Sequence, residues 1–570
     1  MTDINTMGEV VSTDLLIIGG GVGGLAAAIK AKEAYPDTDV LIVEKQTTGW
    51  AGKATKIGGF LAFLAQNGDP DKFVDFQVKN AGIYENDQDA LYKYVTSTYP
   101  AIEFLAEMGV NIARTPDGKI VSIENTFAPE YSMTFVDLDM MQPMRSRASK
   151  LGVKFQNKTH IVDLLQQNGK VTGATGFNII DGGFYIFKAK ATLIANGSCG
   201  YKIRRFWVAG TGDGIAAAYR AGAEMRNAEY GNLYGHVVMK DLDGGMAGNM
   251  FLVNSQGENL ARKYVPDMGP AGIFLPVKLG VGLETEVIEG RGPIRFEPPA
   301  PPPGGSGGGR GGGFGPGLPE LTKWNQMMQG KAEKYGPVPL NREIAVPLHG
   351  ELSCIRVDHD MKTTVEGLWA VGDTSYAGSA IAGAVASPPG VTPGSGIMFA
   401  VVSGMWAGPD AVRYAMEAPE SEISNEDIDL RKQETFAPMN TEKGYSPWEA
   451  ISRLQDVVAP MKYSLRRSKE RLNEALSIVA SVKGRLNELY AKDYHYLSKC
   501  HEVISMTACA ELTFTAALAR EESRGFHYRE DFPAQDDNNW LKWVILKQIN
   551  GNLNVSTEEI PIENYRVRPS

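Results

Sequence analysis

The sequence predicts an α/β fold: a Rossmann-like parallel sheet with helices, an inserted α+β capping segment and a helical C-terminal part. Three observations predict it. An apolar run of strand length, 14–18, enters a cluster of glycines, and a helical pattern leaves that cluster. A second apolar run, 40–43, follows at the spacing of a parallel strand. Beyond residue 408 the composition changes to long amphipathic helical patterns.

The glycine cluster has the spacing of a dinucleotide-binding turn. Gly19, Gly21 and Gly24 stand at G-x-G-x-x-G positions. The first glycine permits a sharp turn, the second lets the backbone approach a pyrophosphate, and the third lets helix and strand pack closely. Glu44 ends the second strand, where a carboxylate accepts hydrogen bonds from a ribose. Strand, turn, helix and acid together favour dinucleotide binding over an ordinary glycine-rich turn.

The next two hundred residues continue the α/β pattern. Helices are predicted at 25–34 and 89–108, on either side of a glycine-rich segment. Four later segments read as strands, of which the last two alternate like an antiparallel pair: 152–155, 160–165, 171–177 and 184–189. A separate buried strand is predicted at 191–197.

The middle of the chain, 232–349, is predicted to form the capping domain. It contains an extreme tract, Pro298 to Pro319, with ten glycines and seven prolines. Such a composition cannot bury a core, which favours a flexible excursion; a lid or a partner-contact loop is the alternative. A short helix is predicted between Pro319 and Gly336.

The C-terminal part, 426–570, is predicted to be helical. Leucines and valines at helical spacing predict one helix over 461–491 and a second over 497–520, packed as an antiparallel hairpin. The charges between them are typical of a solvated face, and a partner surface is the alternative.

Composition excludes several classes. The formal net charge is −10, which disfavours a broad nucleic-acid-binding surface. The four cysteines form no C-x-x-C pair, so we expect no iron–sulfur cluster, zinc site or other metal site in this chain. The N-terminal residues carry no targeting signal, and no apolar run reaches the length of a membrane span. We expect a soluble, cytoplasmic protein.

Several motifs occur in an order that resembles one family. They are Glu44-Lys45, Gly58-Gly59, Ala195-Asn196-Gly197, 211–214, 221–223, 367–373 and the segment 519–533. This set resembles the flavoprotein subunits of succinate dehydrogenase, fumarate reductase and L-aspartate oxidase. Within the group, 348–351, 361–368 and the helical C-terminus look most like the alpha subunit of adenylylsulfate reductase.

The resemblance implies FAD as the dinucleotide, held by a discontinuous domain of residues 1–231 and 350–425. The residues that it implies for cofactor binding are Gly19, Gly21, Gly24, Glu44, Lys45, Gly58, Gly59, Ala195, Asn196, Gly197, Asp213, Gly372, Asp373, Gly396 and Ile397.

Two departures from the family change the expectation. Succinate- and fumarate-type members clamp a substrate carboxylate with an arginine in a region that corresponds here to 376–389, which contains no arginine. The same region lacks the Asn-Pro-His-like residues of the adenylylsulfate enzyme. Members with covalent flavin carry a histidine at the position of Gly52, so the FAD here should be non-covalent.

Three residues are candidates for chemistry. His349 aligns with an active-site histidine position of the family and could donate a proton. Lys278 follows a Gly/Pro-rich segment where related enzymes place a basic substrate contact. Trp207 lies where the adenylylsulfate enzyme has a tryptophan near the flavin. Each has a structural alternative: a histidine satisfying backbone groups, a solvated lysine and an aromatic core residue.

The sequence therefore predicts an FAD-dependent reductase or dehydrogenase of the fumarate reductase type, acting on a small-molecule substrate that is not a simple C4 dicarboxylate. Adenylylsulfate-type sulfur chemistry and a flavin electron-transfer subunit without a substrate site stay open. There is no second nucleotide fingerprint and no cysteine cluster. The resemblance therefore implies a separate redox partner, such as an iron–sulfur ferredoxin-like subunit; the oligomeric state stays open.

Overall fold

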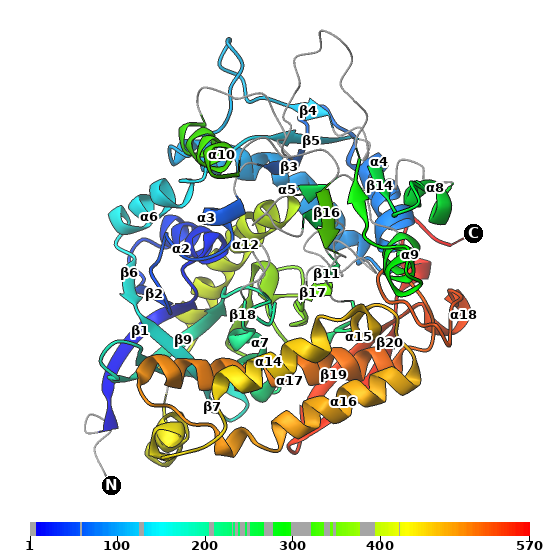
Figure 1. The fold of residues 1–570 in the computed structure, drawn as a ribbon. Helices are drawn as coiled ribbons and strands as arrows, with labels where there is room; N and C mark the ends of the chain where they lie inside the picture. The colour runs from blue at the N-terminus through cyan, green and yellow to red at the C-terminus, as the bar shows by residue number, and fades with distance from the viewer. Residues whose placement is uncertain are drawn as a thin grey trace.

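The core of the protein is a seven-stranded mixed sheet with helices on both faces (Figure 1). The computed structural model describes residues 7–57, 60–124, 130–203, 210–230, 232–233, 237–239, 246–247, 251–266, 277–297, 321–335, 342–345, 349–376, 394–420 and 422–569. The strands run in the order β6 (Lys154–Asn157), β2 (Val40–Glu44), β1 (Glu9–Ile18), β9 (Phe184–Ile194), β8 (Lys170–Asn178) and β7 (Thr159–Gln167). A seventh strand, β18 (Leu368–Ala370), also pairs with β9.

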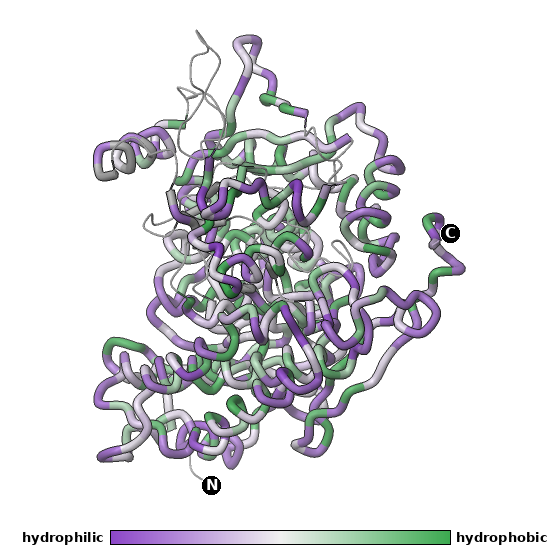
Figure 2. Tube along the Cα trace, turned by 45° about the vertical axis from the view of Figure 1, so that its right-hand side comes forward, coloured by the Kyte–Doolittle hydropathy of each residue, from purple (hydrophilic) through white to green (hydrophobic). Residues whose placement is uncertain are grey.

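The first strand is apolar along its C-terminal half because both of its faces are buried. Leu15 and Ile17 enter one hydrophobic core, whereas Leu16 and Ile18 enter the core on the other face. β1 pairs in parallel with β2 and β9, and such strands lack the polar alternation of a half-exposed strand. Figure 2 shows hydrophobic segments running through the middle of the molecule.

One prediction about the sheet was wrong. The segments 184–189 and 191–197 were expected to be separate strands, but β9 runs without interruption from Phe184 to Ile194. It pairs with β8 on one side and with β1 on the other. The pairing with β8 is antiparallel, and the pairing with β1 is parallel, so one strand belongs to both parts of the sheet.

Two long helices pack closely on the first face of the sheet. They are α2 (Val22–Ala34) and α12 (Ser395–Glu417). A Cβ atom added at Gly404 or Gly408 of α12 would overlap backbone oxygens of α2, so glycine is required for this approach. The predicted helix over 89–108 is α5 (Gln88–Glu107) on the same face, and its N-terminus is capped by the Asp87 side chain.

The remaining elements of the N-terminal half surround this face. The helices are α3 (Ala54–Ile57), α4 (Pro70–Gln77), the π-helix η1 (Val78–Gly82) and α6 (Met141–Lys150). A three-stranded sheet contains β3 (Leu61–Leu64), β5 (Tyr131–Thr134) and β4 (Ile123–Glu124). On the opposite face, α7 (Asp213–Arg220) leads to β10 (Met225–Arg226).

The segment predicted to be the capping domain has its own small sheet. Its order is β13 (Met246–Ala247), β12 (Val237–Met239), β16 (Arg342–Ala345), β15 (Arg295–Phe296) and β14 (Leu252–Val253). The helices α8 (Leu260–Tyr264), α9 (Val277–Ile288) and α10 (Thr322–Tyr335) accompany it, and α10 matches the helix expected before Gly336. The two ends of the segment meet in a short antiparallel ladder, in which β11 (Asn232–Leu233) pairs with β17 (His349–Glu351). The tract 298–319 lies outside the described residues, and the domain boundaries stay a prediction.

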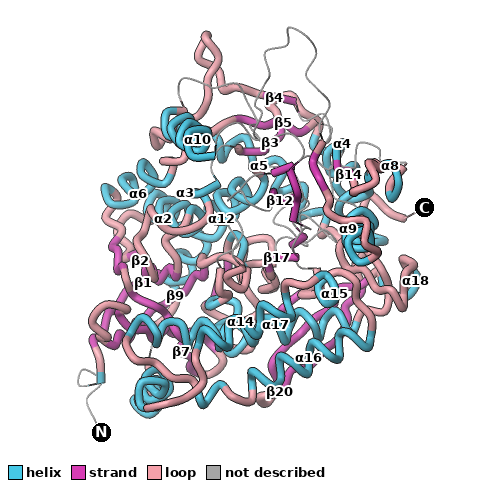
Figure 3. Tube along the Cα trace, in the orientation of Figure 1, coloured by secondary structure: helices cyan, strands magenta, loops and turns pink. Residues whose placement is uncertain are grey.

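The C-terminal part is helical first and then folds into a hairpin (Figure 3). Its helices are α13 (Asn425–Phe436), η5 (Ala437–Asn440), α14 (Pro447–Val458), α15 (Met461–Ser464), α16 (Lys469–Lys483), η6 (Leu486–Glu488), α17 (Tyr494–Ala519) and α18 (Asp537–Trp540). The hairpin β19 (Lys542–Ile549) and β20 (Asn552–Glu559), followed by η7 (Ile562–Asn564), was not predicted. β19 pairs with β10, so the end of the chain is joined to its N-terminal half.

The single helix expected over 461–491 was also wrong. The chain leaves helical geometry after Ser464, and Ser468 begins α16 by accepting a hydrogen bond from the Arg471 N–H. The helical spacing of the leucines continues across this break, which is why the periodicity did not reveal it. The expected packing of two helices is confirmed, since α16 packs on α17.

Among the described helices, α17 alone has the length and mean hydropathy of a membrane span. Of its most apolar window, 67% is buried inside the protein, where it forms part of the second core. This burial is typical of a core helix of a folded domain.

Candidate functional site

The glycine turn between β1 and α2 has the geometry that the spacing predicted. Gly19 has φ +114°, and a Cβ there would lie 2.5 Å from the Ala195 oxygen. A Cβ at Gly24 would overlap the Gly19 carbonyl oxygen, so this residue permits the close packing of helix on strand. At Gly21, by contrast, the nearest atom to such a Cβ is 4.0 Å away. The space above Gly21 is therefore open at the N-terminus of α2.

Two buried polar atoms, one beside this turn and one at the start of α7, have no hydrogen-bond partner among the described residues. They are the Thr48 hydroxyl, which lies against Gly20, and Asp213 Oδ1. Buried polar atoms are normally paired, so each would accept or donate a hydrogen bond to a bound molecule with hydroxyl or phosphate groups. An open space above a helix N-terminus, with the unpaired Thr48 hydroxyl near it, fits the pyrophosphate part of FAD.

Glu44 is buried at the end of β2, as predicted, but its carboxylate already has backbone partners. Oε2 accepts a hydrogen bond from the Gly20 N–H at 2.7 Å, and Oε1 accepts one from the Gln46 N–H at 2.8 Å. Glu44 therefore holds the glycine turn in place. Each carboxylate oxygen keeps a further lone pair that can accept a hydrogen bond from a ribose hydroxyl.

Lys45 and Asp213 form an ion pair across the domain. Lys45 Nζ lies 2.7 Å from Asp213 Oδ2 and 3.0 Å from Glu502 Oε1 of α17. Burial alone would lower the pKa of Lys45, but the two carboxylates outweigh it and raise that pKa. Burial likewise opposes ionisation of Asp213, yet Lys45 holds the pKa of Asp213 well below its usual value. Both groups are therefore charged, and Asp213 is held in place while its Oδ1 has no partner among the described residues.

A second turn, at the end of β9, approaches the same region. Thr374 Oγ1 donates to the Gly197 carbonyl at 2.8 Å and lies 3.2 Å from Asn196 Oδ1. Gly372 has φ +64°, and its N–H donates to Ser403 Oγ at 3.0 Å. The predicted residues at 195–197 and 372–373 are thus joined by one threonine, whose role no local sequence pattern indicates.

Lys53 connects three predicted parts of the site. Its Nζ forms ion pairs with Asp373 and with Glu351 of β17, and it lies 3.3 Å from Ser198 Oγ. Lys53 follows Gly52 in the chain, so it joins the first glycine turn, the Gly372–Asp373 turn and the strand that begins at His349. It was missed because a lysine in a glycine-rich loop carries no periodic signal; its place in the segment 50–60 was the one available clue.

The start of α12 lies beside these turns. Gly394 has φ +89°, and a Cβ there would lie 2.8 Å from the Ala62 nitrogen of β3. Gly396 and Ile397 occupy the first turn of the helix, where backbone N–H groups lack intrahelical acceptors and favour negative charge. The buried Ser395 hydroxyl is 3.4 Å from the Tyr131 hydroxyl, and burial raises the pKa of Tyr131.

The C-terminal segment 519–533 contributes to a buried cluster of charges. Arg520 is fully buried and donates to Glu229 at 2.7 Å, to Glu522 at 3.0 Å and to Glu85 at 3.1 Å. Arg524 donates to both oxygens of Glu522, at 2.8 and 3.0 Å. Burial raises the pKa of Glu85 to about 7, although Arg520 opposes the change. Glu85 was not selected from the sequence because Glu85-Asn86-Asp87 reads as a solvent-exposed polar turn.

Several predicted residues lie outside the described parts of the chain or can be placed only by backbone. Trp207, Gly58, Gly59 and 377–389 lie outside them. His349 is placed as the first residue of β17, opposite Leu233 of β11. Lys278 is exposed at the start of α9, which agrees with the solvated alternative. The structure does not test their catalytic roles, which stay predictions.

Two family models match the chain. The model described as an FAD binding domain matches residues 14–261, and the model described as a fumarate reductase flavoprotein C-terminal region matches residues 452–570. The 8-methylmenaquinol:fumarate reductase flavoprotein subunit of Wolinella succinogenes is 25% identical; the alignment covers 99% of this chain and 93% of the relative.

Solved structures show the same fold. A variant of the FrdA chain of E. coli quinol fumarate reductase has a TM-score of 0.81 at 20% identity and covers 99% of this chain and 98% of its own. Adenylylsulfate reductase from Archaeoglobus fulgidus has a TM-score of 0.77 at 21% identity, with 97% and 96% covered.

The glycine turns and these matches define an FAD-dependent oxidoreductase. The chain belongs to the family of succinate dehydrogenase and fumarate reductase flavoproteins, whose fold adenylylsulfate reductase shares.

Proposed function

We propose that this flavoprotein transfers a hydride to or from a polarised carbon–carbon double bond of a substrate larger or less charged than a C4 dicarboxylate. The observation that carries the proposal is the link made by Lys53. It ties the strand that starts with His349 to Asp373 and to the loop beside Gly21, so the candidate proton donor belongs to the same unit as the flavin-binding turns.

Bound FAD supplies the redox step, and the chain supplies position and proton transfer. An imidazole nitrogen at His349 can deliver a proton to the carbon that does not receive the hydride, because its ordinary pKa lies near neutrality. Lys53 keeps the carboxylates of Glu351 and Asp373 compensated beside this strand.

The substrate class rests on the missing arginine of 376–389. A charge-assisted hydrogen-bonded contact contributes about 1.5–3 kcal/mol, so its absence weakens binding of a small dicarboxylate by about one to two orders of magnitude. A substrate that is bound more by apolar contact depends less on such an anchor.

We further propose that electrons reach the flavin through a separate redox partner, for which an iron–sulfur ferredoxin-like subunit is suited. Two observations from the sequence support this: it has one nucleotide fingerprint, and its four cysteines form no C-x-x-C pair. In the fold all four are buried, and Cys199, Cys354 and Cys509 lie near one another. The Wolinella relative is itself named a flavoprotein subunit.

The function is tested by reoxidation of the reduced flavin. Protein reduced anaerobically with dithionite is mixed with fumarate, cinnamate, 2-cyclohexen-1-one or adenylylsulfate, and absorbance at 450 nm is followed. We expect cinnamate or the enone to reoxidise the flavin at least tenfold faster than fumarate. His349→Asn should slow that step by about 10²–10⁴-fold, whereas Arg413→Gln, at an exposed position of α12, should leave it unchanged.

Each other outcome selects a different function. Fastest reoxidation by fumarate would overturn the substrate class, and reaction with adenylylsulfate alone would establish sulfur chemistry. Failure of every acceptor would indicate an electron-transfer subunit. Reduction of the isolated protein by NADH or NADPH at the turnover rate would remove the need for a partner.

The flavin is expected to be non-covalent. Gly52 is exposed with φ +89°, and a Cβ there would lie 3.7 Å from the Gly21 Cα, so the position faces the glycine turn but offers no atom for attachment. Trichloroacetic acid should therefore release the flavin into the supernatant, as measured at 450 nm. A yellow pellet would contradict this expectation.

A further inference from the structure

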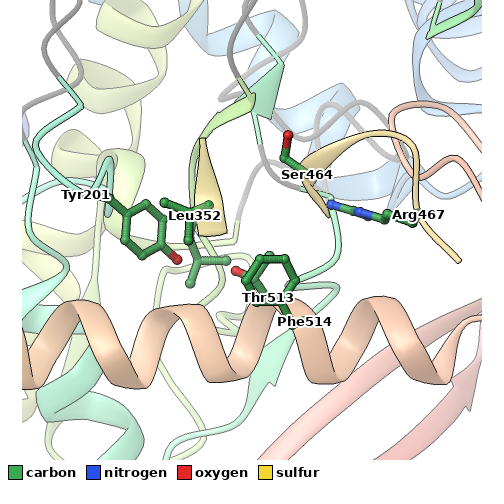
Figure 4. A pocket seen from close by; sticks show the side chains of 7 residues that line it. Tyr201, Leu352, Ser464, Arg467, Thr513 and Phe514 are labelled. Carbon is green, nitrogen blue, oxygen red and sulfur yellow. The ribbon is translucent and has the colours of Figure 1, made fainter. Parts of the chain in front are cut away.

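A small cavity lies between the flavin-binding sheet and the C-terminal helices. Its walls include Tyr201 and Leu352 on one side, and Ser464, Arg467 and Thr513 on the other (Figure 4). Tyr201 follows the turn after β9, Leu352 follows β17, Arg467 lies in the link between α15 and α16, and Thr513 belongs to α17. The space between them admits about one water-sized particle, and we call it the Arg467 cavity.

Arg467 is a fully buried guanidinium that forms no ion pair with a carboxylate of the described residues. Its Nη1 donates to the Glu229 carbonyl and to His527 Nδ1, both at 2.7 Å, whereas Nε and Nη2 have no partner in the part of the chain that the structure describes. The other buried arginines nearby, Arg520, Arg524 and Arg529, are each paired with a carboxylate. Burial lowers the pKa of Arg467 to about 10, which is the expected effect of a buried cation that is poorly compensated.

The neighbours of Arg467 cannot supply the missing charge. His527 accepts from Arg467 at Nδ1, so its proton is on Nε2, which donates to the Arg520 carbonyl at 3.1 Å. Burial holds the pKa of His527 well below its usual value, so this ring is neutral. The Glu229 carboxylate attracts Arg467 but is bound by Arg520 at 2.7 Å. The positive charge beside the cavity is therefore left without a direct counterion among the described residues.

Two further donors face the same space. Residues Tyr201 and Thr513 are 4% and 6% exposed, and their hydroxyls lie beside one another. Neither hydroxyl makes a hydrogen bond of ordinary geometry with another of the described residues. Figure 4 shows both hydroxyls and the guanidinium of Arg467 directed toward the space beside α17. The Ser464 hydroxyl donates instead to the Pro460 carbonyl at 3.0 Å. Buried donors are rarely left unpaired, so a bound species that accepts several hydrogen bonds is required.

We propose that the Arg467 cavity binds a small monovalent anion of the halide class, held by Arg467, Tyr201 and Thr513. A halide accepts hydrogen bonds from all three groups and compensates the buried charge, whereas a water molecule satisfies the donors and leaves the charge unpaired. A halide is larger than a water molecule, so the side chains that line the cavity must move slightly apart to admit it, whereas phosphate, sulfate and carboxylates require a much larger opening. The anion would connect three parts of the fold through its hydrogen bonds: Thr513 of α17, Arg467 in the link before α16, and Tyr201 in the segment after β9.

The test uses the flavin-loaded protein and bromide. Crystals grown with sodium bromide in place of chloride should show an anomalous peak between the Arg467 guanidinium and the Tyr201 and Thr513 hydroxyls. In parallel, the thermal midpoint is measured from 1 to 300 mM chloride, with gluconate keeping the ionic strength constant. We expect a saturable rise in the midpoint, because a ligand of the folded state stabilises it by mass action.

The variants separate the site from general salt effects. Thr513→Val and Tyr201→Phe each remove one donor with little change in shape, and should raise the half-saturating chloride concentration at least fivefold. Thr515→Val, the same substitution two residues further along α17 at a residue that does not line the cavity, should leave it unchanged. A bound water without anomalous signal, or an unaltered chloride response in both donor variants, would overturn the proposal.

Discussion

Gly24→Ala should abolish flavin binding, whereas Gly21→Ala should weaken it in a protein that still folds. The added Cβ at Gly24 would overlap the Gly19 carbonyl oxygen, a backbone atom that can move only if α2 leaves β1. The added Cβ at Gly21 meets no protein atom closer than 4.0 Å, and Gly21 has an ordinary φ of −75°. It would instead occupy the space in which the pyrophosphate is expected.

The two variants are compared by circular dichroism and by titration of the apoprotein with FAD. We expect Gly24→Ala to yield no folded protein by circular dichroism, or to yield a folded protein that binds no FAD. Gly21→Ala should keep the wild-type spectrum and bind FAD at least tenfold more weakly. Equal FAD affinity of Gly21→Ala and the wild type would show that the cofactor does not lie above this residue.

Replacement of Arg520 should destabilise the protein more than any substitution on its surface. Arg520→Gln would leave three buried glutamates without their shared cation, and it would remove donors from the carbonyls of Trp540 and Lys542. Breaking a buried ion pair by removing one partner costs about 3–5 kcal/mol. We therefore expect the midpoint of urea unfolding to fall sharply, or the chain to fail to accumulate as folded protein.

The matched control is Arg413→Gln on α12. The side chain of Arg413 is 59% exposed and pairs with Asp410, so its loss should cost at most about 1 kcal/mol. Arg520→Lys keeps the charge but cannot reach all five acceptors. Its urea-unfolding midpoint should therefore lie between those of Arg520→Gln and Arg413→Gln. If the unfolding midpoints of Arg520→Gln and Arg413→Gln agreed within error, the claim that the buried charge cluster stabilises the fold would be refuted.

Local signals in the sequence predicted the flavin-binding unit. The run Leu15 to Ile18, the glycine spacing and Glu44 lie within thirty residues of one another, and each is fixed by the conformation of its own segment. The family resemblance added Asp213 and the turns at 195–197 and 372–373, which local pattern alone does not connect.

Residues whose role depends on distant partners were not predictable in this way. Glu85 lies 435 positions before Arg520 in the chain, and nothing in its own neighbourhood distinguishes it from a surface acid. Arg467 reads as part of a charged helix face because the leucine spacing continues through the break at 465–468. Lys53 acquires its function from two acids that lie about three hundred residues later.

The same long-range pairing determines when the chain can finish folding during synthesis. The Gln88 side chain exchanges two hydrogen bonds with the backbone of Val567, at 2.6 and 3.1 Å, across 479 positions. β10 receives its partner only when β19 has left the ribosome, and Glu85 and Glu229 receive their cation only when residue 520 has emerged. The N-terminal half therefore carries unpaired acids and an uncovered strand until residues 520–549 have been synthesised. Uncovered strand edges favour misfolding, so residues 520–567 form the segment whose arrival completes this fold.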